Sequence, residues 1–140
     1  MRKRYDGKKR NPWNDIECGG NYARSMASFS LIPILSGFVA DLSENKLTFC
    51  PRIKQRPFKS IWSVPTGWGT MELYDKKLIL TLKSGYVEIK QLNLPFIETV
   101  KSVCIDEKIV EFKWCHEILS IALNKATDQV IINVEEKTGE

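Results

Sequence analysis

Histidine and paired cysteines are scarce in this chain of 140 residues. His116 is the only histidine, and the four cysteines lie far apart without any C-x-x-C pair. Structural zinc sites and disulfide frameworks depend on clustered cysteine or histidine residues. The sequence therefore predicts no metal and no cofactor, and we expect free, buried thiols in a reducing, cytoplasmic location.

Cys115 and His116 are the one arrangement that suggests a nucleophile beside a base. The two residues follow an alternating segment, and neighbouring residues of a β-strand point to opposite faces. We therefore expect no contact between the two side chains and predict no catalytic residue in this chain.

Long hydrophobic runs are also absent. The uncharged segment Ser25–Ala40 has 16 residues and includes Pro33 and four serines, whereas a spanning helix needs ~20 apolar residues. A signal peptide would begin with a short basic region, but here 24 residues that include Asp15 and Glu17 precede the apolar segment. We expect neither a transmembrane segment nor export.

Positive charge is concentrated at the start of the chain. Residues 1–10 hold six Lys or Arg and one Asp, a contribution of +5, which leaves −1 for the other 130 residues out of the total of +4. A basic tail can bind phosphate groups, but no basic surface rich in aromatic residues follows it. We interpret this segment as a solvated tail and predict no nucleic-acid partner.

The remaining composition, with 43% hydrophobic and 27% charged residues, is typical of one globular core. The predicted regions are a basic tail (1–10), a loop plus helix (11–41), a β-rich region (42–135) and a short tail (136–140).

The predicted helix spans Tyr22–Gly37. Asn21 is a plausible N-cap, Gly37 is the natural stop, and Pro33 either kinks the helix or ends it early. Apolar or small residues occupy every face, which is typical of a helix that is buried on most sides. Because a single sheet cannot cover such a helix, we expect either an oligomer or the end of a larger protein, and we favour the second.

From Leu42 onward apolar residues alternate with polar ones, which predicts strands. The predicted strands are Lys46–Cys50, Phe58–Val64, Thr70–Tyr74, Leu78–Lys83, Tyr86–Leu92, Ser102–Ile105, Ile109–Trp114, Ile118–Leu123 and Gln129–Val134. Turn residues recur every ~8–12 residues, as in an antiparallel sandwich. The predicted fold class is α+β and mainly β, with one buried N-terminal helix followed by an antiparallel β-sandwich.

Asp15, Glu17 and Arg24 are the only charged residues between Arg10 and Asp41. A carboxylate and a guanidinium at the mouth of a pocket suit a polyhydroxyl ligand, because each makes directed, charge-assisted hydrogen bonds. A structural ion pair near a helix start explains the same spacing. Two acids one residue apart are a poor catalytic pair for a glycosidase, whose carboxyl groups lie ~5–9.5 Å apart on opposite sides of the bond.

Five short segments resemble the C-terminal part of glycoside hydrolase family 116, the non-lysosomal glucosylceramidases and microbial β-glucosidases. The match is dense in residues 10–38, where it includes the segments RNPWNDIECG, YARSMAS and SGF. The segments FCPR (49–52) and GWGT (67–70) are similar to bacterial members. The family combines a β-sandwich with an α/α barrel, so the resemblance implies that Tyr22–Gly37 is a late barrel helix.

The resemblance also implies residue roles. Family members are retaining β-glucosidases whose catalytic Glu and Asp lie in earlier helices, which this chain lacks. An acid after NPWN and an arginine nine residues later contact the glucose, which points to Asp15 and Arg24 as substrate-binding residues. The family acid is usually Glu, so Asp15 is one methylene shorter, and Glu17 is expected to fix the loop.

Two hypotheses follow for the chain. In the first it is a C-terminal fragment of such an enzyme, inactive by itself, whose partners are the glucoside substrate and the missing N-terminal part. In the second it is a stand-alone β-sandwich carbohydrate-binding or interaction module with a basic tail. Trp13, Trp62 and Trp68 could stack on a sugar, although large aromatic residues in a small sandwich are more often part of the core.

Overall fold

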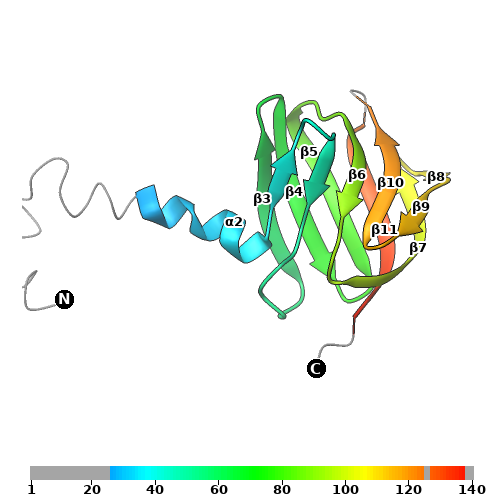
Figure 1. Ribbon diagram of the computed structural model, residues 1–140, viewed down its shortest axis with the longest axis horizontal. Coiled ribbons are helices and arrows are strands. Elements are labelled where there is room, and N and C mark those ends of the chain that lie inside the picture. The colour runs from blue at the N-terminus through cyan, green and yellow to red at the C-terminus, as the bar shows by residue number, and fades with distance from the viewer. Residues whose placement is uncertain (1–25, 125–126, 138–140) are drawn as a thin grey trace, which may run out of the picture. The chain divides into compact units, whose positions relative to one another are not determined.

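The computed structural model describes residues 26–124 and 127–137. The chain falls into two units, Met1–Ile32 and Pro33–Glu140, and the second is described over most of its length. Element labels follow Figure 1. The predicted mainly-β architecture is confirmed, because two sheets and a short helix make up the described residues.

The first sheet has five strands in the order β1-β2-β6-β10-β9. Their bounds are β1 Val39–Asp41, β2 Lys46–Thr48, β6 Ile89–Asn93, β9 Lys113–Cys115 and β10 Ile118–Leu123. The strand pairs are antiparallel except for β2 with β6, which is parallel.

The second sheet has six strands in the order β3-β4-β5-β11-β7-β8, and all of its pairs are antiparallel. Their bounds are β3 Phe58–Val64, β4 Gly67–Tyr74, β5 Lys77–Gly85, β7 Ile97–Ile105, β8 Lys108–Val110 and β11 Gln129–Glu136. The two sheets lie face to face (Figure 1), as expected for a sandwich.

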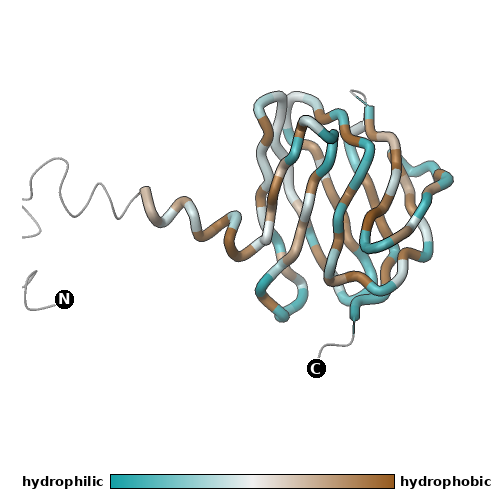
Figure 2. Tube along the Cα trace, in the orientation of Figure 1, coloured by the Kyte–Doolittle hydropathy of each residue, from teal (hydrophilic) through white to brown (hydrophobic). Residues whose placement is uncertain are grey.

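The core lies between the sheets and takes every second side chain of most strands. In β11, Val130, Ile132 and Val134 are buried while the residues between them are not. Figure 2 shows the same alternation of hydrophobic and hydrophilic residues along the strands. Burial of one face is what fixes the strand register, because a slip of one residue would turn the apolar set outward.

Some strands differ from the prediction for identifiable reasons. The predicted strand Ile109–Trp114 is two strands, β8 and β9, because the chain passes from one sheet to the other at residues 111–112. Strand β7 begins five residues earlier than predicted, at Ile97, and its pairing with β11 shifts register twice. Such bulges break the two-residue period that reveals a strand in the sequence.

The helix α2 spans Leu31–Ser36, and residues 26–29 form a separate helical turn. The break falls at Ser30, whose hydroxyl donates a hydrogen bond of 2.6 Å to the Ala27 carbonyl. Pro33 lies in the first turn of α2, where its missing N–H is tolerated. The missing N–H and the proline ring prevent a helix that begins before Ser30 from continuing through Pro33. Pro33 therefore interrupts the predicted helix instead of ending it.

The predicted burial of this helix is wrong for this chain. Ser36 is the only buried residue of α2. Phe29 is 74% exposed and Ile34 is 58% exposed. Sequence periodicity detects an apolar surface but does not identify what covers it.

Candidate functional site

The predicted sugar-binding residues Asp15, Glu17 and Arg24 lie outside the described residues, as does Trp13. Their predicted roles therefore stay predictions. The structure describes the same stretch from Met26 onward.

The segment that follows Arg24 has no charge and large exposed side chains. We call residues 26–36 the apolar helical segment. Its exposed large hydrophobic residues are Met26, Phe29, Leu31, Ile32, Ile34 and Leu35. Isolated exposed apolar residues are normal on a protein surface, whereas a contiguous apolar patch marks an interaction surface.

A well-defined junction holds the end of α2 against the loop between β2 and β3. The Cys50 amide donates to the Ser36 carbonyl at 3.2 Å, and the Arg52 amide donates to the Leu35 carbonyl at 2.9 Å. These two carbonyls belong to the last turn of the helix, where no intrahelical donor is available. The loop therefore completes the hydrogen bonding of the helix end.

Gly37 gives the junction its shape. Its φ of +60° reverses the chain after the helix, and the Phe38 amide donates to the Pro33 carbonyl at 3.2 Å, the bond that defines a Schellman cap. A Cβ on Gly37 would lie 2.1 Å from the Cys50 carbonyl oxygen. The helix stop predicted at Gly37 is confirmed, and only glycine fits there.

Two further contacts fix the same loop. The rings of Phe38 and Phe49 pack with centroids 5.3 Å apart. Arg56 donates to both carboxylate oxygens of Glu136 in β11, at 2.9 and 2.5 Å, and to the Ile53 carbonyl at 2.8 Å. A bidentate guanidinium–carboxylate pair is geometrically specific, so the loop is held to the sandwich at its far end as well.

The segment Gly67–Thr70 has a packing role in β4. Gly69 lies opposite Trp62 of β3, and a Cβ on Gly69 would lie 2.5 Å from Cζ2 of that indole and 2.1 Å from the Thr81 carbonyl oxygen. Trp62 is buried in the core, whereas Trp68 is 47% exposed. Of these two tryptophans, only Trp68 is free to meet a ligand from solvent.

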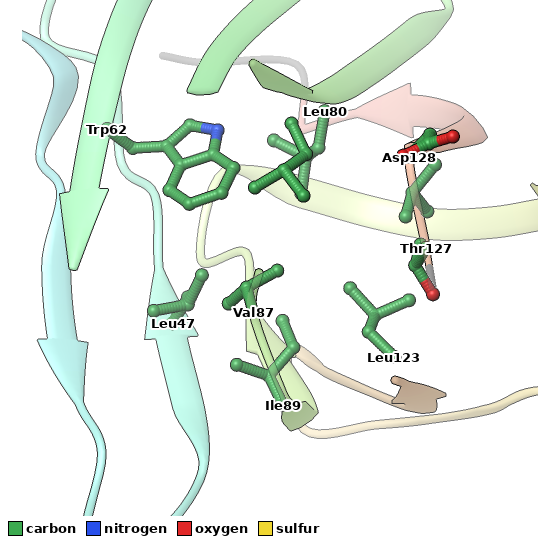
Figure 3. A pocket seen from close by; sticks show the side chains of 10 residues that line it. Leu47, Trp62, Leu80, Val87, Ile89, Leu123, Thr127 and Asp128 are labelled. Atoms are coloured by element: carbon green, nitrogen blue, oxygen red, sulfur yellow. The ribbon is translucent and has the colours of Figure 1, made fainter. Parts of the chain in front are cut away.

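A small cavity lies between the sheets beside Trp62 (Figure 3). Its volume is about 20 Å³, and the side chains that line it are mostly apolar, with Thr127 and Asp128 at one end. Nε1 of Trp62 is buried without a hydrogen-bond partner in the described residues. A cavity of this size has room for about one water molecule, so it is no sugar site.

The expectation that Cys115 and His116 do not touch is wrong. The Cys115 Sγ lies 2.9 Å from His116 Nδ1. His116 has a φ of 48° and belongs to the turn after β9, not to the strand, so strand alternation does not apply to it. The pair is exposed at the turn between β9 and β10.

Among the residues that the structure describes, no group of three His, Cys, Asp or Glu side chains could hold a metal ion. Within the same part of the chain, no helix has the length and apolar character needed to cross a membrane.

Comparison with known sequences adds no relative. Neither a search of protein-family models nor a search of curated proteins found a match to this chain. Support for a function is therefore limited to the resemblance of short segments and to the junction between α2 and the β2–β3 loop.

The junction is the feature that sequence reasoning missed. The sequence did single out both sides of the junction, because SGF (36–38) and FCPR (49–52) are two of the segments that resemble family 116. Alternation and helical periodicity describe side chains, however, and give no information on which backbone groups meet.

Proposed function

We propose that this chain is the C-terminal part of a retaining β-glucosidase similar to glycoside hydrolase family 116. In this proposal Asp15 and Arg24 bind the glucose, Glu17 fixes their loop, and the catalytic Glu and Asp belong to a preceding part of the enzyme. The chain by itself does not hydrolyse glucosides.

The observation that supports the proposal is the junction between α2 and the β2–β3 loop. Residues 36–38 and 49–52 both belong to the stretches that resemble the family, and the two segments are hydrogen-bonded to each other. A helix joined to a β-sandwich is also the domain combination that the resemblance implies.

The exposed apolar helical segment fits the same proposal. A helix that lacks a charged face is stable when other helices pack around it, as they do in an α/α barrel. In the proposed enzyme the preceding helices cover Phe29 and Ile34, whose side chains are exposed here.

The chemistry assigned to Asp15 and Arg24 is recognition of hydroxyl groups. A carboxylate accepts two hydrogen bonds from vicinal hydroxyls, and a guanidinium donates two in a fixed plane. Together they orient the sugar ring for attack by the catalytic nucleophile. Loss of either group leaves the hydroxyls without a charged partner, a change that costs ~1.5–3 kcal/mol per bond.

The test is turnover of an aryl β-glucoside by the full-length enzyme. Asp15→Ala removes both hydrogen bonds, at a cost of ~3–6 kcal/mol. We therefore expect kcat/KM to fall by ~10²- to 10⁴-fold, since each 1.4 kcal/mol is a tenfold change, and we expect Asp15→Glu to retain activity. Glu111→Ala is the control, because Glu111 is an exposed acid with no role in the proposal. Unchanged kcat/KM in Asp15→Ala, or Asp15-dependent turnover by the 140-residue chain, would contradict the assignment.

The alternative is a stand-alone β-sandwich module, and one observation favours it. The sandwich has a continuous core of its own, with side chains such as Phe49, Leu73 and Ile132 completely buried. In that case the endogenous protein is a species near 16.1 kDa.

A further inference from the structure

A second pocket opens at one end of the sandwich and shares Val87 with the cavity between the sheets. The turn between β1 and β2 forms one side, and the connections β3–β4 and β5–β6 form the other. We call it the Tyr86 pocket. Its lining residues are Leu42, Asn45, Thr66, Tyr86, Val87 and Glu88, and its volume is about 160 Å³.

The walls of the Tyr86 pocket are held by backbone hydrogen bonds. The Asn45 carbonyl accepts from the amides of Lys90, at 2.8 Å, and Gln91, at 3.2 Å, and the Thr66 carbonyl accepts from the Tyr86 amide at 3.0 Å. Asn45 has a φ of 52°, which sets its position in the turn. The pocket is therefore preformed, and binding would require little ordering of the chain.

Asp41 stabilises the turn that carries Asn45. Its Oδ1 accepts hydrogen bonds from the Ser43 amide, the Ser43 hydroxyl and the Glu44 amide. These bonds, the Ser43 hydroxyl first, lower the pKa of the Asp41 carboxyl. The turn is thus ordered at neutral pH by an ionised side chain.

Three polar side chains of the pocket, those of Asn45, Thr66 and Glu88, can meet a ligand. The side chains of Asn45, Thr66 and Glu88 form no hydrogen bond or ion pair with other described residues. An amide, a hydroxyl and a carboxylate together offer both donors and acceptors. Tyr86 adds an aromatic ring that is 36% exposed, and Val87 adds a buried apolar surface.

The size and charge of the pocket limit the ligand. Sites for drug-sized ligands begin at ~300 Å³, so this pocket suits a single small ring. No lysine or arginine lines it among the described residues, which disfavours a phosphate or a carboxylate ligand. A neutral ring with hydroxyl edges and an apolar face matches the remaining chemistry.

We propose that the Tyr86 pocket binds a neutral hexopyranose unit. The amide of Asn45 and the carboxylate of Glu88 hold vicinal hydroxyls, and the Tyr86 ring lies against the C–H face of the sugar. This site involves neither Asp15 nor Arg24, so it does not depend on the enzyme proposal.

The test is a titration of the 15N-labelled 140-residue chain with methyl β-D-glucopyranoside, followed by 1H–15N NMR. We expect saturable shifts in the amides of the Tyr86 pocket. Asn45→Gly removes the amide but retains the positive φ, because glycine adopts that conformation readily, and Glu88→Gln keeps the size of the side chain. Each variant should bind at least tenfold more weakly.

The controls separate the possible failures. Glu111→Gln and Asp15→Ala should leave the pocket shifts unchanged, and spectra of all variants should match outside the pocket if the fold is retained. Saturation by glucosamine but not by the neutral glucoside would show a cation site and overturn the proposal. Absence of saturable shifts in the wild-type pocket, or equal affinity in Asn45→Gly and Glu88→Gln, would also overturn it.

Discussion

Glu72 forms a cross-strand ion pair that lowers its pKa. On the outer side of β4 its carboxylate accepts from Lys59 of β3 at 2.6 Å and from the Tyr74 hydroxyl at 3.1 Å. The Lys59 hydrogen bond is the largest cause of a Glu72 pKa below the ordinary value of 4.5. Cross-strand pairs of opposite charge stabilise a sheet in this way.

We expect Lys59→Met to raise the pKa of Glu72 toward 4.5, with a small remaining depression due to Tyr74. Because the folded-state pKa is lowered, the contribution of Glu72 to stability is complete above the ordinary pKa and is lost as the pH falls through the lowered one. Wild-type protein should therefore lose this stabilisation on acidification below about pH 4.5, whereas Lys59→Met should lose less. A carboxyl 13C NMR titration measures the pKa directly.

Lys113→Met is the control for this titration, because Lys113 lies on β9 in the other sheet. It should leave the Glu72 titration unchanged. A Glu72 pKa that is the same in wild type and Lys59→Met would disprove the importance of the ion pair.

At the scale of elements, the joint between α2 and the sandwich depends on Gly37. An alanine at this position would have to adopt a left-handed conformation, which costs ~1–2 kcal/mol. Its Cβ would lie 2.1 Å from the Cys50 carbonyl oxygen. The clash is with backbone, so it cannot be relieved by rotating a side chain. The helix end or the loop must move.

We expect Gly37→Ala to lower the free energy of unfolding by about 1–3 kcal/mol. Urea denaturation followed by the fluorescence of buried Trp62 measures the change. Ser63→Ala, on the exposed side of β3, should stay within ~0.5 kcal/mol of wild type. A Gly37→Ala protein as stable as wild type would mean that the junction does not hold the helix end.

The elements also show which sequence signals are dependable. Strands β3 and β10 have the predicted bounds, because each alternates without interruption over one buried face. Strand β1 was missed, since Val39–Asp41 begins within the uncharged run that contains the helix. The apolar character of that run was predicted correctly, but its exposure depends on what packs against it, which a periodicity does not encode.

For the whole molecule, the two-sheet sandwich followed from composition and alternation, whereas the candidate site did not follow from them. Asp15, Glu17 and Arg24 lie outside the described residues, so their roles remain predictions. The junction at Gly37 and the Tyr86 pocket bring together residues from separate elements. Their backbone partners are set by tertiary packing, and a single sequence carries no local signal for such contacts.

In the proposed function this chain completes a larger enzyme. Intact-mass spectrometry under denaturing conditions of the endogenous protein, purified with an antibody against the sandwich, tests it most directly. We expect a single covalent chain much heavier than 16.1 kDa, because the proposed function places the catalytic residues and the helices around the apolar helical segment in the same polypeptide. An endogenous chain of 16.1 kDa would contradict the claim and favour the stand-alone module.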